Sequence, residues 1–245
     1  MRDLIRGFKY PLQGFNLIAK PGIRLFVIIP LLINTLLFST VIAVGAHEIV
    51  NISDWLSARW QWADWITWLL WPLFAVLAFS VVFYGFTLVA NVVAAPWNGF
   101  LAEAVVRYLG DSQQQQISGW SRLPREIAAA ISNELRKLLY FGIWAVPLLL
   151  LFLIPMVNAA APFLWLLFCS WLLALEYLDF PMSNHGLAFP EIRRRLGRRK
   201  GLVLGFGLGV MVLTLIPVLN FLAIPIAVTS ATKLWVHELM PSASN

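Results

Sequence analysis

The chain carries one six-residue pattern twice, Leu153-Ile154-Pro155-Met156-Val157-Asn158 and Leu215-Ile216-Pro217-Val218-Leu219-Asn220, and each copy interrupts a long apolar stretch. Proline removes a helical N–H donor and disfavours helical geometry in the residue before it, while asparagine can hydrogen-bond the backbone groups so freed. A further proline follows each copy, at Pro162 and Pro225. Broken backbone is tolerated at membrane depth only where protein or water covers it. The pattern therefore predicts two pairs of half-helices inside a bilayer, with Pro155, Asn158, Pro217 and Asn220 at their tips.

The composition is that of an integral membrane protein. Of the 245 residues, 60% are hydrophobic and only 12% are charged, and the mean hydropathy is +0.78. A soluble domain is nearer half apolar and a quarter charged. The 12 tryptophans fit interfacial belts, and the group from Trp55 to Trp71 indicates one such boundary.

The basic residues are distributed unevenly along the chain. Residues 1–24 and 98–137 contain 5 Lys and Arg each and residues 179–200 contain 6, whereas residues 47–64 contain 1. Cytoplasmic loops carry the excess of Lys and Arg in membrane proteins. Both termini are therefore predicted to lie in the cytoplasm, and residues 47–64 outside.

Hydrophobic periodicity divides the chain into segments of one all-α membrane domain, residues 1–245. Helical spacing of apolar residues, with basic residues between them, predicts an N-terminal helix lying in the membrane interface. Apolar runs of sufficient length predict two long transmembrane helices. The expected segments are an interfacial helix at 1–20, spanning helices at 23–46 and 65–97, a cytoplasmic helical section at 98–137, and broken helical hairpins at 138–178 and 201–236.

The length of the hairpin arms favours partial penetration of the membrane. Each arm of the first hairpin has about 16 residues, or about 24 Å at helical rise, which is short of a hydrocarbon core of about 30 Å. Re-entrant hairpins are therefore favoured over full crossings. Charge asymmetry does not distinguish the two, because either arrangement returns the chain to the cytoplasm.

Patterns typical of enzymes, metal sites and nucleotide binding are absent from the sequence. The three histidines are far apart, no HExxH or CxxC spacing occurs, and no nucleophile elbow is found. The glycines of residues 201–209 lack a GK[ST] ending, and they are predicted to permit close helix packing. We expect no enzymatic activity, metal, cofactor, use of ATP or nucleic-acid partner.

The junction Pro21-Gly22-Ile23-Arg24 has the chemistry of an oxyanion site. A helix N-terminus presents free N–H groups and a positive dipole end, glycine permits close approach, and arginine adds a charged fork. Gly22, Ile23 and Arg24 are therefore the candidate binding residues. The alternative is that Arg24 is an ordinary positive anchor near lipid headgroups.

Further polar residues suggest a pathway through the protein. Glu103 and Arg107 stand four apart on an expected helix at the mouth of a span, where they can gate a polar path or form a plain surface pair. Polar side chains from Thr229 to Lys233 would be costly facing lipid, so we expect them against protein or water. The basic run 193–200 is expected to contact anionic lipid headgroups rather than to collect anions. The pathway candidates are Asn34, Asn91, Asn98, Glu103 and Arg107.

Several of these stretches together resemble the bacterial CysZ-type sulfate permease family, which is related to the EI24 membrane proteins. The similar stretches follow the family's order along nearly the whole chain. They are Pro21-Gly22-Ile23-Arg24 leading to Ile29-Pro30-Leu31-Leu32-Ile33-Asn34, then Ala94-Ala95-Pro96-Trp97-Asn98-Gly99-Phe100-Leu101-Ala102-Glu103, then Tyr177 to Leu187, and Ile216 to Ala223.

The resemblance implies sulfate uptake across the bacterial inner membrane for cysteine synthesis, by a channel-like or ion-coupled permease. It also implies two long spanning helices, two partly penetrating hairpins, and a homo-oligomer such as a hexamer, with sulfite or other oxyanions as further ligands. The family's Gly-Leu-Arg-Arg segment maps onto Gly22, Ile23 and Arg24, and Leu25 stands where a second arginine often occurs. A non-transporting membrane scaffold or lipid-associated protein is the alternative function.

Overall fold

The computed structural model describes residues 1–59, 72–73, 76, 79–80, 97–110 and 123–240. All regular secondary structure in these residues is helical, which agrees with the predicted all-α class. The chain divides into two compact units, one formed by Met1–Leu25 with Asn98–Asn245 and the other by Phe26–Trp97.

The second unit contains most of helix α2, Arg24–Arg59, which has 36 residues. This helix covers the predicted span at 23–46. It also continues beyond that span, so residues 47–59 are helical, while the external position of residues 47–64 stays a prediction. Residues 46–59 contain neither glycine nor proline, so nothing in them ends the helix. The other predicted span, 65–97, lies largely outside the described residues.

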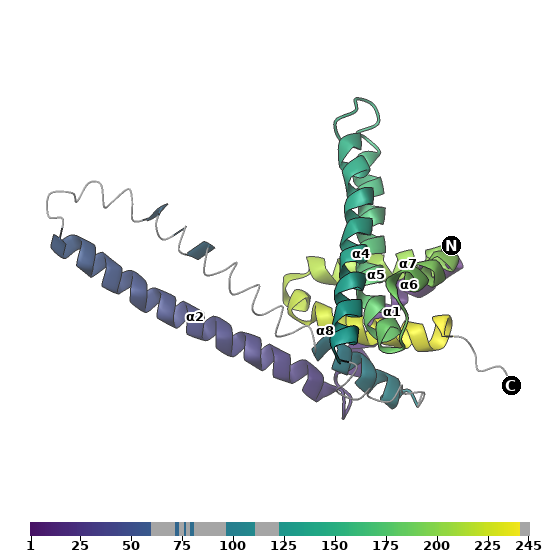
Figure 1. Ribbon diagram of the computed structural model, residues 1–245, viewed down its shortest axis with the longest axis horizontal. Helices are drawn as coiled ribbons and strands as arrows, with labels where there is room; N and C mark the ends of the chain where they lie inside the picture. Colours follow the sequence, from purple (N-terminus) through teal and green to yellow (C-terminus); the bar gives the residue numbers. More distant parts are fainter. Residues whose placement is uncertain (60–71, 74–75, 77–78, 81–96, 111–122, 241–245) are drawn as a thin grey trace. The chain divides into compact units, whose positions relative to one another are not determined.

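The first unit contains the remaining helices, and those from residue 161 onward follow one another with short connections (Figure 1). Residues 97–108 are helical, so the predicted cytoplasmic section begins with a helix. Helix α4 (Leu123–Leu151) continues through residue 138, where the predicted cytoplasmic section was expected to end and the first hairpin to begin. The other elements are α1 (Arg2–Ile18), α4 (Leu123–Leu151), α5 (Ala161–Asn184), α6 (Phe189–Arg198), α7 (Lys200–Leu215), α8 (Pro217–Leu234) and a π-helical turn, η2 (Trp235–Leu239).

Each copy of the repeated pattern lies where one helix ends and the next begins. Pro155 and Asn158 lie in the turn between α4 and α5, where Met156 has a φ of 68°. Pro217 is the first residue of α8, and Asn220 follows one turn later. Proline is tolerated at a helix start because the N–H it lacks would have no partner there. Pro225, in contrast, lies inside α8 and does not end the helix.

Helix α1 packs against α7 and α8 through small residues. A Cβ atom on Gly7 would overlap the carbonyl oxygen of Leu202, and one on Gly205 would overlap that of Leu4. A Cβ atom on Gly14 would also lie too close to the backbone of α8, at 2.6 Å from the carbonyl oxygen of Ile226. Glycines on both sides of a crossing allow two helix backbones to approach closely. The glycines of α7 therefore have the packing role that the sequence predicted, and α1 is their main partner.

The buried face of α1 differs from the apolar stripe expected to face the membrane. Its buried residues are Gly7, Tyr10, Pro11, Gly14 and Leu17. Large apolar side chains of the predicted stripe remain exposed, namely Leu4, Ile5, Phe8 and Leu12.

The polar residues near the end of α8 lie inside the protein. Thr229, Ser230 and Thr232 are fully buried. Their hydroxyl groups donate to carbonyl oxygens three or four residues earlier in the same helix, at 2.6–3.1 Å. These bonds satisfy the hydroxyl donors locally. The three side chains are thus part of the packed interior and do not line a polar path.

Apolar side chains cover the outside of both hairpins. Met156 is 94% exposed at the first tip, and Phe221 is 79% exposed at the second. Among the described residues, two stretches are long and apolar enough to cross a membrane, Ala161–Asn184 and Leu219–Leu239. Large exposed apolar surfaces of this kind suit contact with lipid or with another protein.

Candidate functional site

The turn between α1 and α2 carries the candidate anion-binding residues. Gly22 has a φ of +87°, and a Cβ atom placed on it would have open space around it. Glycine adopts this left-handed conformation at little cost, which explains its place here. The side chain of Ile23 is fully buried and anchors the turn. The Ile23 and Arg24 amides both donate to the carbonyl oxygen of Lys20, at 3.1 Å each.

The free donors of this turn are the Gly22 amide and the Arg24 guanidinium. The Arg24 side chain is exposed, and its guanidinium makes no ion pair or hydrogen bond with any residue that the structure describes. The Gly22 amide likewise has no acceptor within the described ranges. Ile23 was predicted to contribute to the anion site, but its amide N–H is already bonded to the carbonyl oxygen of Lys20. Leu25, next to Arg24, is 57% exposed and adds no charge.

The helix at residues 97–108 presents the charged pathway candidates on one side. Glu103 and Arg107 are exposed, and across the described parts of the chain they form no ion pair with each other. Leu101, Ala102 and Val105, on the opposite side, are buried. The structure therefore favours two separate exposed charges over a surface pair.

The remaining pathway candidates are described only in part. Asn98, at the start of the 97–108 helix, is partly buried. Asn34 lies in α2 within the other compact unit, and its side chain is outside the described residues, as is all of Asn91. The structure thus brings Asn98, Glu103 and Arg107 together on one helix and does not join them to the other two.

One hydrogen bond connects two of the stretches that carry the family resemblance. The side-chain amide of Asn184 donates to the carbonyl oxygen of Gly99 at 3.0 Å. This bond attaches the start of the 97–108 helix to the end of α5. Both residues were identified in the sequence, but their contact joins positions 85 apart and is visible only in the fold.

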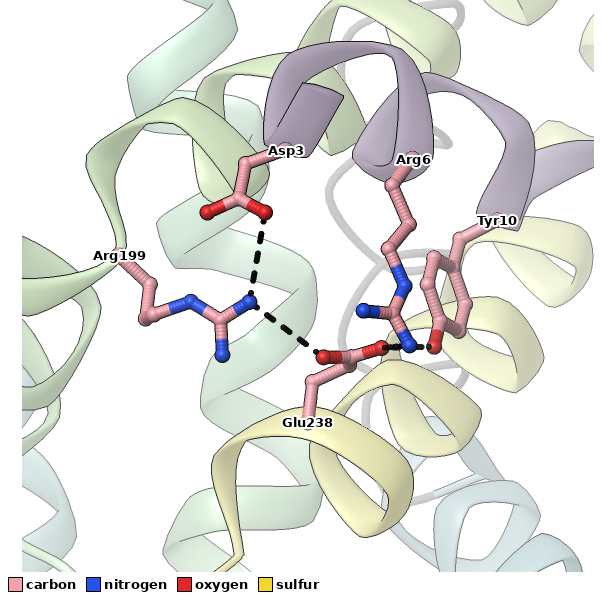
Figure 2. A network of polar contacts seen from close by, with 5 residues as sticks. All are labelled: Asp3, Arg6, Tyr10, Arg199 and Glu238. Atoms are coloured by element: carbon pink, nitrogen blue, oxygen red, sulfur yellow. Dashed lines mark hydrogen bonds and ion pairs between the residues drawn. The ribbon is translucent and has the colours of Figure 1, made fainter. Parts of the chain in front are cut away.

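A buried carboxylate joins the N-terminal helix to the C-terminal turn (Figure 2). The Glu238 side chain is 5% exposed, and it binds Arg6 of α1 and Arg199 of the α6–α7 junction. The Tyr10 hydroxyl donates to the same carboxylate at 3.0 Å. Burial, together with this bond, raises the pKa of Tyr10 to about 12. Asp3 approaches Arg199 at 3.6 Å and completes the network.

A second charged cluster joins α4 to α5. The Lys137 ammonium lies 2.9 Å from Glu134, 3.0 Å from Glu176 and 3.5 Å from Asp179, and its side chain is 5% exposed. An ammonium group has three N–H donors, so three carboxylates can satisfy it fully. Neither cluster was predicted from the sequence, because each joins helices that are far apart along the chain.

Trp235, in the π-helical turn, is buried and lies near the side chains of His185 and Arg195. Its ring lies 5.6 Å from the ring of His185 and 5.9 Å from the Arg195 guanidinium carbon. Among the buried side-chain groups that the structure describes, its indole N–H is without a hydrogen-bond partner. Across the same ranges, no three His, Cys, Asp or Glu side chains come together as metal ligands.

Comparison with known proteins agrees with the resemblance seen in the sequence. The family model described as "Sulfate transporter CysZ/Etoposide-induced protein 2.4" matches residues 10–225. A sulfate transporter CysZ of Pseudomonas fluorescens (strain Pf0-1) is 40% identical over 96% of this chain and 94% of its own length. The sulfate transporter CysZ of Vibrio parahaemolyticus (serotype O3:K6) is 37% identical over 95% of this chain and 94% of its own. The chain belongs to the sulfate transporter CysZ/Etoposide-induced protein 2.4 family.

Proposed function

We propose that this protein transports sulfate into the bacterial cell across the inner membrane, supplying sulfate assimilation and cysteine synthesis without using ATP itself. The observation that carries the proposal is the identity of 37–40%, over nearly the whole length, with proteins named sulfate transporters. The exposed apolar hairpins support a membrane location. The identity with named sulfate transporters favours a transporter over a membrane scaffold without transport activity.

Sulfate at neutral pH is a dianion with four acceptor oxygens and no donor. A transport site must supply N–H groups and positive charge without holding the ion too tightly for release. The Arg24 guanidinium and the Gly22 amide meet this requirement, because both are free donors on an exposed turn. The Ile23 amide joins them only if its bond to Lys20 opens. With Leu25 in place of a second arginine, the capture site has a single charge.

The route beyond the capture site is proposed to follow the helix at 97–108. Asn98, Glu103 and Arg107 offer polar groups of both signs along one helix, and Asn34 and Asn91 are further candidates along the same route. We propose that a homo-oligomer, such as a hexamer, encloses this route. An unpaired Glu and Arg would then interact with the passing anion or with a neighbouring subunit.

The hairpins are proposed to enter the membrane from the cytoplasmic side without crossing it. From Lys137, at the charged base of α4, the helix continues 14 residues to Leu151, or about 21 Å at helical rise. Helix α7 has 16 residues, or about 24 Å. Both lengths are short of a core of about 30 Å, and any tilt would reduce the depth further. The exposed apolar face of α1 supports an interfacial position for that helix.

The capture site is tested by replacing Arg24 with alanine in the purified full chain. Hydrogen bonds to charged groups contribute about 1.5–3 kcal/mol each, so we expect sulfate affinity to fall roughly 10- to 150-fold. Binding would be measured by isothermal titration calorimetry, and uptake of labelled sulfate in proteoliposomes. Arg198→Ala, at another exposed arginine, should leave both unchanged. If Arg24→Ala binds and transports sulfate like the parent protein, the capture site lies elsewhere.

A further inference from the structure

Tyr140 forms a corner between α4, α5 and α6. Its ring meets Phe189 edge-on at 5.9 Å, and the Arg193 guanidinium carbon lies 5.1 Å from the ring centre. Its hydroxyl oxygen accepts a hydrogen bond from the Trp171 indole N–H at 3.2 Å. The Tyr140 O–H proton is therefore left to donate elsewhere, and it has no acceptor in the part of the chain that the structure describes.

Two arginines near this corner, Arg136 and Arg193, form no ion pair with a carboxylate among the residues that the structure describes. On α6, Arg194 and Arg195 bind Glu191, and they hold the pKa of that carboxyl below its usual range, chiefly through the Arg195 hydrogen bond. Arg193 is exposed, and within the described residues it contacts no carboxylate. Arg136 is also exposed and unpaired within them, and it precedes Tyr140 by four residues. Side chains four apart on a helix share one face. Arg136 thus shares a face of α4 with Tyr140, and the Arg193 guanidinium lies over the Tyr140 ring.

The same face of α4 continues into exposed apolar surface. Ile143, three residues after Tyr140, is 68% exposed, and the adjacent Leu139 is 57% exposed. A phosphate diester offers acceptor oxygens and no donors, and it is attached to acyl chains that bury against apolar side chains. Free sulfate would use the polar groups alone. Hydrogen-bond donors that lie directly beside an exposed apolar surface therefore suit a phospholipid better than free sulfate.

We propose that Arg136, Tyr140 and Arg193 form a binding site for the phosphate of an anionic phospholipid, whose acyl chains lie along Ile143 and Leu139. Two guanidinium groups that form no ion pair among the described residues favour a phosphate, and they repel the cationic part of a zwitterionic headgroup. Bound there, the lipid joins α4 to α6 at the base of the first hairpin. This site is separate from the turn at Arg24.

The test measures lipid binding to the purified full chain in a neutral detergent. Phosphatidylglycerol and phosphatidylcholine are titrated separately, and bound lipid is counted by native mass spectrometry. Each arginine near an anionic lipid surface strengthens binding about fivefold. We expect Arg193→Gln to weaken phosphatidylglycerol binding about fivefold, and the double variant Arg136→Gln/Arg193→Gln about 25-fold. Arg193→Lys keeps the charge and should lose less than twofold.

Matched controls separate a built site from diffuse attraction. Arg198→Gln removes an exposed arginine from the same helix and should change binding less than twofold. Tyr140→Phe removes only the hydroxyl, so this conservative variant still tests the site if the double variant does not fold. We expect it to bind phosphatidylglycerol roughly threefold more weakly. The proposal would be overturned if Arg198→Gln weakened phosphatidylglycerol binding as much as Arg193→Gln does, or if the Arg193 and Tyr140 variants bound this lipid as tightly as the parent protein. It would also be overturned if phosphatidylcholine bound with equal affinity, or if millimolar inorganic sulfate displaced phosphatidylglycerol.

Discussion

Lys137 shows how one buried charge organises its surroundings. Its ammonium is enclosed by Glu134, Glu176 and Asp179, and the two α5 carboxylates hold the base of that helix against α4. Removing one partner from a buried ion pair leaves an uncompensated charge, which costs more than the net contribution of the intact pair. The lysine is thus the member of the cluster whose loss is expected to matter most.

Lys137→Met is predicted to lower the free energy of unfolding by about 2–4 kcal/mol. This loss is smaller than the largest values for fully buried ion pairs, because Glu176 and Asp179 are partly exposed. The measurement is denaturant unfolding of the purified protein in detergent micelles. Lys9→Met, at an exposed lysine of α1, is the control and should change stability little. Adding Glu176→Gln and Asp179→Asn to Lys137→Met should recover part of the loss, and no recovery would argue against the electrostatic explanation.

At the scale of elements, the crossing of α1 and α7 depends on the absence of side chains. Gly205→Ala would place a Cβ atom against the backbone of Leu4, which cannot move as a flexible side chain does. Overpacking of this kind costs about 1–3 kcal/mol. We predict a lower unfolding midpoint for this variant, measured by thermal unfolding followed by intrinsic fluorescence.

Gly142→Ala is the matched control for this prediction. Gly142 also lies within a helix, α4, but a Cβ atom placed on it would meet nothing within 4 Å. Alanine is favoured over glycine in a helix by about 0.8–1.0 kcal/mol, so this change should raise the midpoint. Opposite signs for the two variants are expected. If both variants raise the unfolding midpoint, the backbones of α1 and α7 are not in close contact at Gly205.

For the whole molecule, the depth of the hairpins decides how the chain is arranged in the bilayer. In a Cys169→Ser background, a single cysteine is placed at Asn158 or at Asn220, the two tips. Hairpins that enter from the cytoplasm and stop within the core predict little labelling of either position by a membrane-impermeant maleimide added outside whole cells. A cysteine at Leu4, on the exposed face of α1, is the cytoplasmic control. Ready labelling of both tips from outside would show full crossings instead.

The sequence supported predictions wherever neighbouring residues decide the outcome. Helix breaks at Pro155 and Pro217 follow from the missing N–H of proline, and the turn at Gly22 follows from the conformational freedom of glycine. Residues 47–59 continue helix α2, because none of them is glycine or proline, and Pro225 does not interrupt α8. The external position of residues 47–64 stays a prediction.

By itself, the sequence determined that this protein is helical, is built for a membrane, contains two interrupted apolar stretches and carries an arginine shortly after a glycine. Only the tertiary structure decided that α1 is the partner of the α7 glycines, that Glu238 binds Arg6 and Arg199, and that Lys137 is enclosed by carboxylates. The physical reason is the distance along the chain over which each property acts. Hydropathy and backbone preference are local properties of the chain, whereas packing and charge compensation depend on groups that only folding brings together.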